Sequence, residues 1–181
     1  MRTPEDVLSF WFVEHGRDDW FGGKPEFDAV LAERFAETLA RLSMGEGFGW
    51  RLTAAGRLAE IIVLDQFSRQ LHRGTPRAFA QDGMALVLAQ EAVAQELDRG
   101  LSPEQCMFLY MPYMHSESVL VHEEAAPLFA RLGLDYCLQA EEGHLSLLRR
   151  FGRYPKRNAV LGRTSTTEEL AYIADSGTGM Y

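Results

Sequence analysis

LAEIIVLDQFSRQLHRG, residues 58–74, is the stretch that decides the fold class. Its residues 61–64 cover more than one helical turn with apolar side chains on every side, which predicts a helix buried all round. Asp65 follows inside this apolar stretch, and a buried carboxylate needs a partner. Arg69 lies one turn further on, at the spacing of an ion pair on one helix face. An arbitrary pair of this kind is usually solvated at the surface, but the apolar neighbours favour a buried pair here.

The rest of the chain carries start and stop signals of further helices, and strand-like alternation occurs nowhere convincingly. Short connections that contain Gly or Pro favour neighbouring helices lying side by side and antiparallel. We therefore predict an all-α fold of seven or eight stacked antiparallel helices in a single domain over residues 1–181. The expected helices cover residues 3–12, 25–42, 53–74, 76–100 with a bend near Gly83, a fifth from Ser102 that Pro112 stops or kinks, 117–132, 134–151, and a last one opened by the capping box of residues 166–169.

Composition places the chain among ordinary globular proteins. Of its 181 residues, 46% are hydrophobic and 24% are charged, which is too apolar for disorder. Cys106 and Cys137 are isolated and match neither a disulfide framework nor a metal-ligand spacing, so reduced core thiols are expected. Acidic residues stand where a signal peptide needs basic ones, and no apolar run is long enough for a membrane span. We expect a cytoplasmic protein without a cofactor.

The stretch RRFGRYPKRNAVLGRTST, residues 149–166, holds six of the eighteen Lys and Arg residues and no Asp or Glu. The formal net charge is −8, so the chain outside these six positive charges carries −14. This acidic surrounding opposes binding to nucleic acid or to an anionic membrane surface. Two interpretations of the basic stretch remain open: a site for a small anion, or internal clamps for carboxylates elsewhere in the chain. A plain basic run is most often solvated, but Gly152, Tyr154 and Pro155 indicate a defined backbone path.

A further candidate site is FLYMPYMHSES, residues 108–118, where the expected kink at Pro112 lies beside aromatic residues. His115 and Glu117 are the candidate general bases, although a structural role for His115 is equally open. His115 and His122, seven residues apart, invite a metal interpretation, but this spacing matches no established short zinc motif, and His144 would be needed from another helix as a third ligand. We therefore expect no metal site.

Several of these stretches together resemble one bacterial family. LDQFSRQLHRGTPRAF, MPYMHSES and RRFGRYPKRNAVLGRTSTTEE, with WFGGKPEFD near the start, are similar to the family catalogued as domain of unknown function 924. The resemblance implies an all-helical domain of the tetratricopeptide-like superfamily, and it supplies no reaction. Lys156 and Ser118 depart from the family pattern, which often has His and Asp there. The recurring polar residues of the family fall on Asp65, Gln66, Arg69, Arg73, His115, Ser116, Glu117, His144, Arg150, Arg153, Arg157, Asn158 and Arg163.

These observations lead to a hypothesis of convergence. The residues expected to meet in one cleft are Asp65, Arg69, His115, Glu117, His144, Arg150, Arg153 and Arg157; Gln66, Arg73, Asn158 and Arg163 complete the predicted ligand-binding set. The positive charges of the basic stretch outnumber Asp65 and Glu117, so the surplus predicts a bound phosphate or carboxylate. An enzyme would use His115 or Glu117 as general base, whereas a binding module would orient a peptide carboxylate. A charge network that only stabilises the fold is the third possibility.

Overall fold

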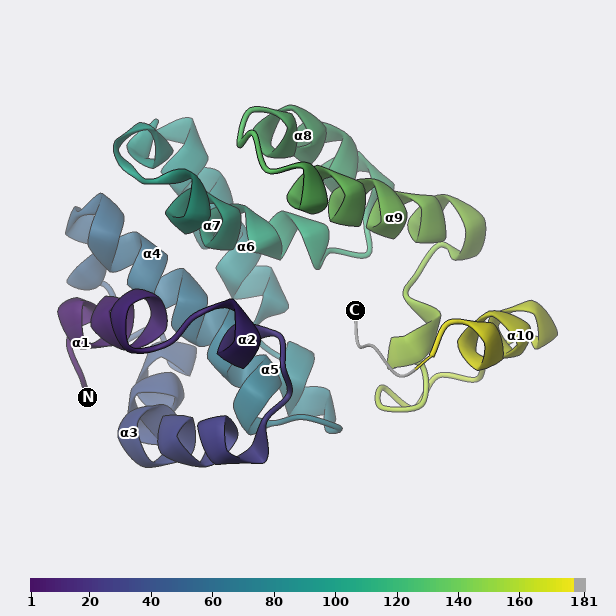
Figure 1. Cartoon of the computed structure of the whole chain (residues 1–181), viewed down its shortest axis with the longest axis horizontal. Coiled ribbons are helices and arrows are strands. Elements are labelled where there is room, and N and C mark those ends of the chain that lie inside the picture. The colour runs from purple at the N-terminus through teal and green to yellow at the C-terminus, as the bar shows by residue number, and fades with distance from the viewer. Residues whose placement is uncertain (178–181) are drawn as a thin grey trace.

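Residues 1–177 are described by the structure, a computed structural model in which α-helices account for most of the chain (Figure 1). All eight predicted helices are present in this part of the chain, one further short helix, α2, is added, and no strand occurs there. The all-α prediction is confirmed. The helices are α1 (Pro4–Ser9), α2 (Arg17–Trp20), α3 (Pro25–Ser43), α4 (Ala54–Ile62), α5 (Ser68–Leu71), α6 (Asp82–Ala94), α7 (Pro103–Met114), α8 (Val119–Ala130), α9 (Asp135–Phe151) and α10 (Thr167–Asp175).

Two stretches of π-helix join or extend these helices. Phe10–Glu14 (η1) prolongs α1, and Val63–Phe67 (η3) connects α4 to α5 without a break. The predicted helix of residues 53–74 is therefore continuous but widened at its centre. Short 3₁₀ turns occur at Trp50–Leu52, Pro76–Phe79, Leu97–Gly100 and Pro155–Arg157.

Local capping explains where several helices begin. The Thr3 side chain accepts a hydrogen bond from the Asp6 amide while the Asp6 carboxylate accepts one from the Thr3 amide. The same reciprocal arrangement opens α7 at Ser102 and α10 at Thr166. Each capping box satisfies amide donors that have no partner inside the helix. These starts were predicted from the sequence because a capping box involves residues only three positions apart.

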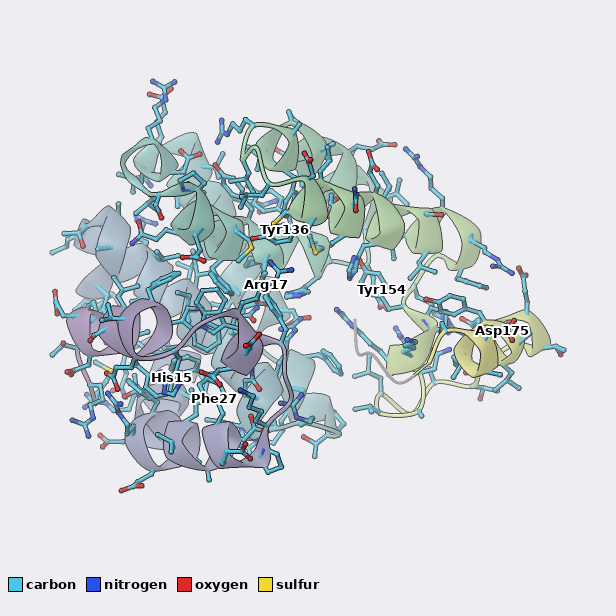
Figure 2. All side chains as sticks on the ribbon, viewed as in Figure 1. His15, Arg17, Phe27, Tyr136, Tyr154 and Asp175 are labelled. Carbon is cyan, nitrogen blue, oxygen red and sulfur yellow. The ribbon has the colours of Figure 1, made fainter. Side chains whose placement is uncertain are left out.

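The core is built around α4 and η3. Residues 58–65 are buried without exception, which confirms the prediction of a helix covered on every side. Aromatic rings from the N-terminal segment fill the space next to it: Trp11 meets Phe67 with ring centres 5.5 Å apart and Phe108 at 5.4 Å. Figure 2 shows His15 and Phe27 in the same region, where their rings pack edge to face at 4.8 Å. α4 contacts α1, α6 and α7, and so forms the centre of the molecule.

The segment after α7 differs from the prediction. α7 passes through Pro112 and ends at Met114, and α8 begins at Val119 rather than at Glu117. The Tyr154 hydroxyl donates a hydrogen bond of 2.7 Å to the Met114 carbonyl, which satisfies one of the carbonyls left free at the helix end. His115 therefore lies at the C-terminal cap of α7, beside a short non-helical connection.

α10 lies beyond the C-terminal end of α9, on the opposite side of the molecule from α1 and α3 (Figure 1). A connection that includes the turn Pro155–Arg157 separates it from α9. Among the described residues, none of the helices combines the length and apolar character that a bilayer crossing requires.

Candidate functional site

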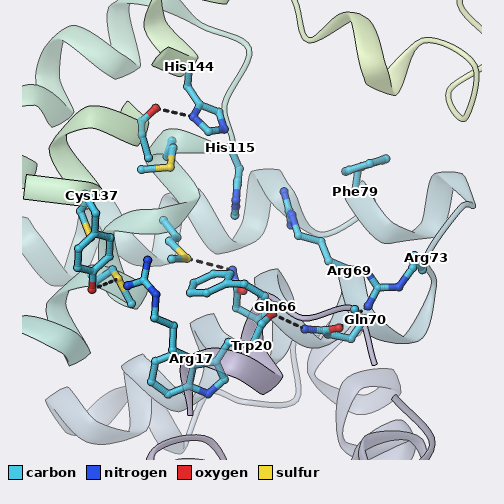
Figure 3. A pocket seen from close by; sticks show the side chains of 17 residues that line it. Arg17, Trp20, Gln66, Arg69, Gln70, Arg73, Phe79, His115, Cys137 and His144 are labelled. Carbon is cyan, nitrogen blue, oxygen red and sulfur yellow. Dashed lines mark hydrogen bonds between the residues drawn. The ribbon is translucent and has the colours of Figure 1, made fainter. Parts of the chain in front are cut away.

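A cavity of about 470 Å³ opens between α2, η3 and α5, α7, and α9 (Figure 3). Five of the predicted ligand-binding residues line it: Gln66, Arg69, Arg73, His115 and His144. Most of the other lining residues were not predicted from the sequence, among them Arg17, Trp20, Phe21, Phe79 and Tyr136. The lining therefore combines three arginines, two histidines and several apolar side chains.

Asp65 lies directly behind this lining, in the π-helical stretch η3. It is fully buried, as predicted, and its Oδ1 accepts hydrogen bonds from Arg69 Nη1 at 2.8 Å and from His115 Nδ1 at 2.7 Å. Burial opposes ionisation of Asp65, but the charge of Arg69 and the hydrogen bonds from His115 and Gln66 hold its pKa below the usual range. Asp65 is therefore an ionised acceptor. π-Helical turns of this kind are frequent at functional sites.

His115 is held in one orientation by this carboxylate. Burial, together with repulsion from Arg69, lowers the pKa of His115, although Asp65 acts in the opposite direction. The imidazole is therefore neutral near pH 7. Since ionised Asp65 can only accept, Nδ1 carries the proton and Nε2 keeps its lone pair. No hydrogen bond from the described residues reaches Nε2 of His115, which is part of the cavity lining.

Arg157 brings the basic stretch to this cluster. Its Nη1 donates to the His115 carbonyl at 3.0 Å and to Asp82 Oδ2 at 3.4 Å. Asp82 also accepts two hydrogen bonds from Arg69, at 2.9 and 3.0 Å. Phe79 lies under both guanidinium groups, 4.7 Å from that of Arg157 and 5.6 Å from that of Arg69. The predicted convergence thus holds for Asp65, Arg69, His115 and Arg157, with Asp82 as a link that the sequence analysis did not identify.

Arg150 and Arg153 do not join this cluster, which corrects the convergence hypothesis. Arg153 binds Glu169 through two hydrogen bonds of 2.6 and 2.8 Å, and Arg150 binds Glu168 at 2.8 Å. Both acids belong to the first turn of α10. The predicted cation surplus is wrong for the same reason, because it did not count Asp82, Glu168 and Glu169. These two arginines act as internal clamps, the second interpretation of the basic stretch.

Glu117 and Arg163 form another clamp. Arg163 binds Glu117 through hydrogen bonds of 2.6 and 2.9 Å, and the Tyr154 amide donates to the same carboxylate at 2.7 Å. Burial opposes ionisation of Glu117, but these hydrogen bonds hold its pKa below the usual range. Glu117 is outside the cavity lining, and so is Asn158, whose amide donates to Ser165 at 3.0 Å. Glu117 is therefore poorly placed as a base.

The remaining histidines have separate environments. His122 is fully buried, with Nδ1 bonded to Glu141 at 2.5 Å and Nε2 near the Ser116 carbonyl at 3.0 Å. His144 lines the cavity and donates from Nδ1 to the Ala140 carbonyl at 2.7 Å. Within residues 1–177 no three His, Cys, Asp or Glu side chains are placed to hold a metal ion. Both cysteines are buried and free.

Arg17 is the lining cation that sequence reasoning missed. It is exposed on α2, and its guanidinium lies 4.0 Å from the ring centre of Tyr136 on α9 (Figure 2). The sequence around it, GRDDWFGG, carries no periodic or motif signal that would mark a site. Its role depends on α2 and α9 being brought together, and these segments are more than a hundred residues apart.

Comparison with known proteins gives a family but no activity. The profile of the bacterial family DUF924, described as bacterial protein of unknown function, matches residues 7–177. A solved structure, of a protein of unknown function from Agrobacterium tumefaciens, is 34% identical and superposes with a TM-score of 0.91 over 96% of this chain and 97% of that chain. No protein with a curated description matches the sequence. With nearly its whole length matched in both comparisons, the chain belongs to the DUF924 family of bacterial proteins of unknown function.

Proposed function

We propose that the cavity binds a small organic anion and that His115 acts on it as a general base. The observation that carries this proposal is the arrangement of His115 itself: a neutral imidazole, held through Nδ1 by a buried carboxylate, forms part of the lining of a cavity that also contains three arginines. Perturbed titratable groups of this kind in a cavity are typical of active sites.

The chemistry follows from the proton positions. With Nδ1–H donated to Asp65, Nε2 can take a proton from a bound molecule, and the resulting imidazolium is stabilised by the Asp65 carboxylate 2.7 Å away. The lowered pKa of His115 keeps the base unprotonated around neutral pH. Arg17, which makes no ion pair among the described residues, favours a negatively charged substrate in the same space.

A small molecule fits this site better than a peptide. The tetratricopeptide-like fold implied by the family resemblance would favour a peptide lying in an open groove. The volume of about 470 Å³ is instead in the range of small-molecule sites, and helices from four parts of the chain surround it.

Chemical modification tests the proposal without knowledge of the substrate. Diethyl pyrocarbonate acylates the free Nε2 of neutral histidines, so we expect His115 to react, as measured by peptide mass spectrometry. His122, whose two ring nitrogens are both bonded, should remain unmodified. A panel of small carboxylates and phosphate esters is then screened by thermal shift. A true ligand at a hundred times its dissociation constant stabilises by about 2.7 kcal/mol.

A compound that stabilises the protein should also protect His115 from acylation and leave His72, outside the cavity, unprotected. Turnover of such compounds is then compared between the wild type and His115→Gln, which keeps a polar side chain but removes the base. If His115 resists acylation, or if no anion protects it, the proposal is wrong. If a compound protects His115 but the wild-type protein does not turn it over, the cavity binds anions without catalysis, and the general-base role is refuted.

A further inference from the structure

Arg17 is a cation whose charge is not neutralised by a neighbour. The other arginines of the cavity are committed to carboxylates: Arg69 binds Asp65 and Asp82, and Arg73 binds Asp28 at 3.1 Å. Arg17, by contrast, makes no ion pair with any of residues 1–177. Its guanidinium lies over the Tyr136 ring, 4.0 Å from the ring centre, and a guanidinium carries five N–H donors, so donors remain for a carboxylate.

Two acceptors complement this donor. Gln66 is 6% exposed and donates from Nε2 to Asp65 Oδ2 at 2.5 Å. Because ionised Asp65 can only accept, the amide nitrogen must face it, which fixes the position of the amide oxygen. No donor in the described part of the chain reaches Gln66 Oε1, and none reaches His115 Nε2. Both residues line the cavity. A ligand therefore finds two acceptors that need a donor.

The charge of the lining decides which donor suits them. Among the described residues the lining contains three arginines and no Asp or Glu. A protonated amine would be repelled there by the charge of Arg17, which no carboxylate of the described residues neutralises, whereas a neutral hydroxyl meets no such repulsion. Much of the rest of the lining is apolar: Met107, Met111 and Met114 come from one face of α7, and methionine side chains adapt to ligands of varied shape.

We propose that the ligand of this cavity is a hydroxylated organic acid with an apolar body. Arg17 binds the acid group, the single hydroxyl proton is shared between Gln66 Oε1 and His115 Nε2 in a three-centre hydrogen bond, and the three methionines contact the apolar part. This inference rests on the proposed function and narrows its substrate class. In this arrangement the hydroxyl proton lies next to His115 Nε2, the atom that acts as general base.

Five compounds that share a three-carbon chain on an aromatic ring separate these contributions by isothermal titration calorimetry. 3-Phenyllactate carries both groups, 3-phenylpropionate lacks the hydroxyl, phenylalanine replaces it with an ammonium group, and 3-phenyllactamide lacks the negative charge. 3-(4-Hydroxyphenyl)propionate moves the hydroxyl to the far end of the molecule. We expect one of the two hydroxy acids to bind at least about tenfold more tightly than 3-phenylpropionate, phenylalanine and the amide, which corresponds to about 1.4 kcal/mol.

Two variants locate the contributions. Arg17→Gln should weaken binding of the hydroxy acid about tenfold or more and leave binding of the amide unchanged. Arg149→Gln, which removes another exposed positive charge, near Glu123 and outside the cavity, is the control and should change neither. Gln66→Met should abolish the preference for the hydroxy acid over 3-phenylpropionate. The ratio of the affinities for the hydroxy acid and for 3-phenylpropionate would not change if Gln66 only supported the fold.

The outcomes separate this inference from the proposed function. If 3-phenylpropionate or phenylalanine binds as tightly as both hydroxy acids, the hydroxyl assignment is overturned while an anion site remains. If Arg17→Gln behaves like Arg149→Gln, the assignment of the acid group to Arg17 is overturned. If none of the acids binds at millimolar concentration but other anions protect His115 from acylation, only this inference fails. If no anion protects His115, both fail.

Discussion

His144 is a histidine whose burial makes it difficult to protonate. Burial lowers its pKa to about 4, and electrostatic repulsion from Arg157 acts in the same direction, against the hydrogen bond to the Ala140 carbonyl. In the unfolded chain its pKa is about 6.5. Between these two values the unfolded state binds more protons than the folded state, so the free energy of unfolding falls as the pH falls. Above pH 6.5 this effect is absent.

Replacing His144 by Phe should therefore remove part of the acid sensitivity. Between pH 7 and pH 4.5 the variant should lose about 2 to 3 kcal/mol less stability than the wild type, because each unit of pKa shift is worth about 1.4 kcal/mol. Urea unfolding at the two pH values measures the difference. His115 and the carboxylates contribute to both proteins and cancel. Equal losses in the two proteins would mean that His144 does not titrate as a buried neutral group.

Asp65 should be far more important for stability than an exposed aspartate in a comparable ion pair. Asp65→Asn leaves the largely buried Arg69 short of one charged partner, and we expect a loss of about 3 to 5 kcal/mol in the free energy of unfolding. Asp28→Asn, which breaks the half-exposed pair with Arg73, should cost about 1 kcal/mol or less. Chemical denaturation of both variants makes the comparison. Similar values for the two would show that solvent reaches the Asp65 cluster.

α2 is positioned by the glycines that follow it. A Cβ at Gly22 would lie 2.1 Å from the backbone oxygen of Asp18, and Gly23 has a φ of +60°. The Gln70 amide also donates to the Trp20 carbonyl at 2.9 Å, which ties α2 to α5. These local constraints place Arg17 at the cavity, although the helix has only four residues.

Gly22→Ala should therefore destabilise the protein by about 1 to 3 kcal/mol and weaken any ligand that binds Arg17, because the backbone must shift. Gly83→Ala on α6 is the matched control, since its Cβ meets nothing within 4 Å. For Gly83→Ala we expect the free energy of unfolding to rise by about 0.5 to 1 kcal/mol, because alanine has the higher helix propensity. Thermal unfolding measures the stability of both variants, and ligand titration measures their affinity for the ligand. An unaltered stability of Gly22→Ala would contradict the close approach to Asp18.

At the scale of the whole molecule, the C-terminal part is attached differently from the rest. The hydrophobic core extends from Val7 to Cys137 and includes no residue of α10. α10 is held instead by the pairs Arg153–Glu169 and Arg150–Glu168 and by the contact between Phe151 and Tyr172, whose ring centres are 5.3 Å apart. Segments with few apolar contacts open locally before the protein unfolds as a whole.

Arg153→Gln should release α10 without unfolding the core. Glu169 is buried with its carboxylate bound by Arg153, whereas Arg150 and Glu168 are both largely exposed. We expect faster hydrogen exchange across residues 167–175 in Arg153→Gln, with little change in the melting temperature. Arg150→Gln should leave the exchange nearly unchanged. A large drop in melting temperature for Arg153→Gln would show that α10 belongs to the cooperative core.

The sequence by itself determined the helices and the ion pair between Asp65 and Arg69. Capping boxes, apolar periodicity and an i, i+4 ion pair join residues less than two helical turns apart, so their geometry follows from the helix alone. Pro112 was predicted to stop or kink α7; the helix does not stop there but continues to Met114, whose carbonyl is bound by Tyr154, forty residues away.

Only the tertiary structure decided how the charges are distributed. Arg153 and Arg157 are close together in the sequence, yet Arg153 binds Glu169 on α10 and Arg157 binds Asp82 on α6. Composition shows six cations in the basic stretch but not which acids are folded against them. The cavity likewise exists because α2 and α9 meet, which places Arg17 against Tyr136. Ion pairs and cavities depend on distances between segments remote in the chain, and those distances are set by the packing of the core.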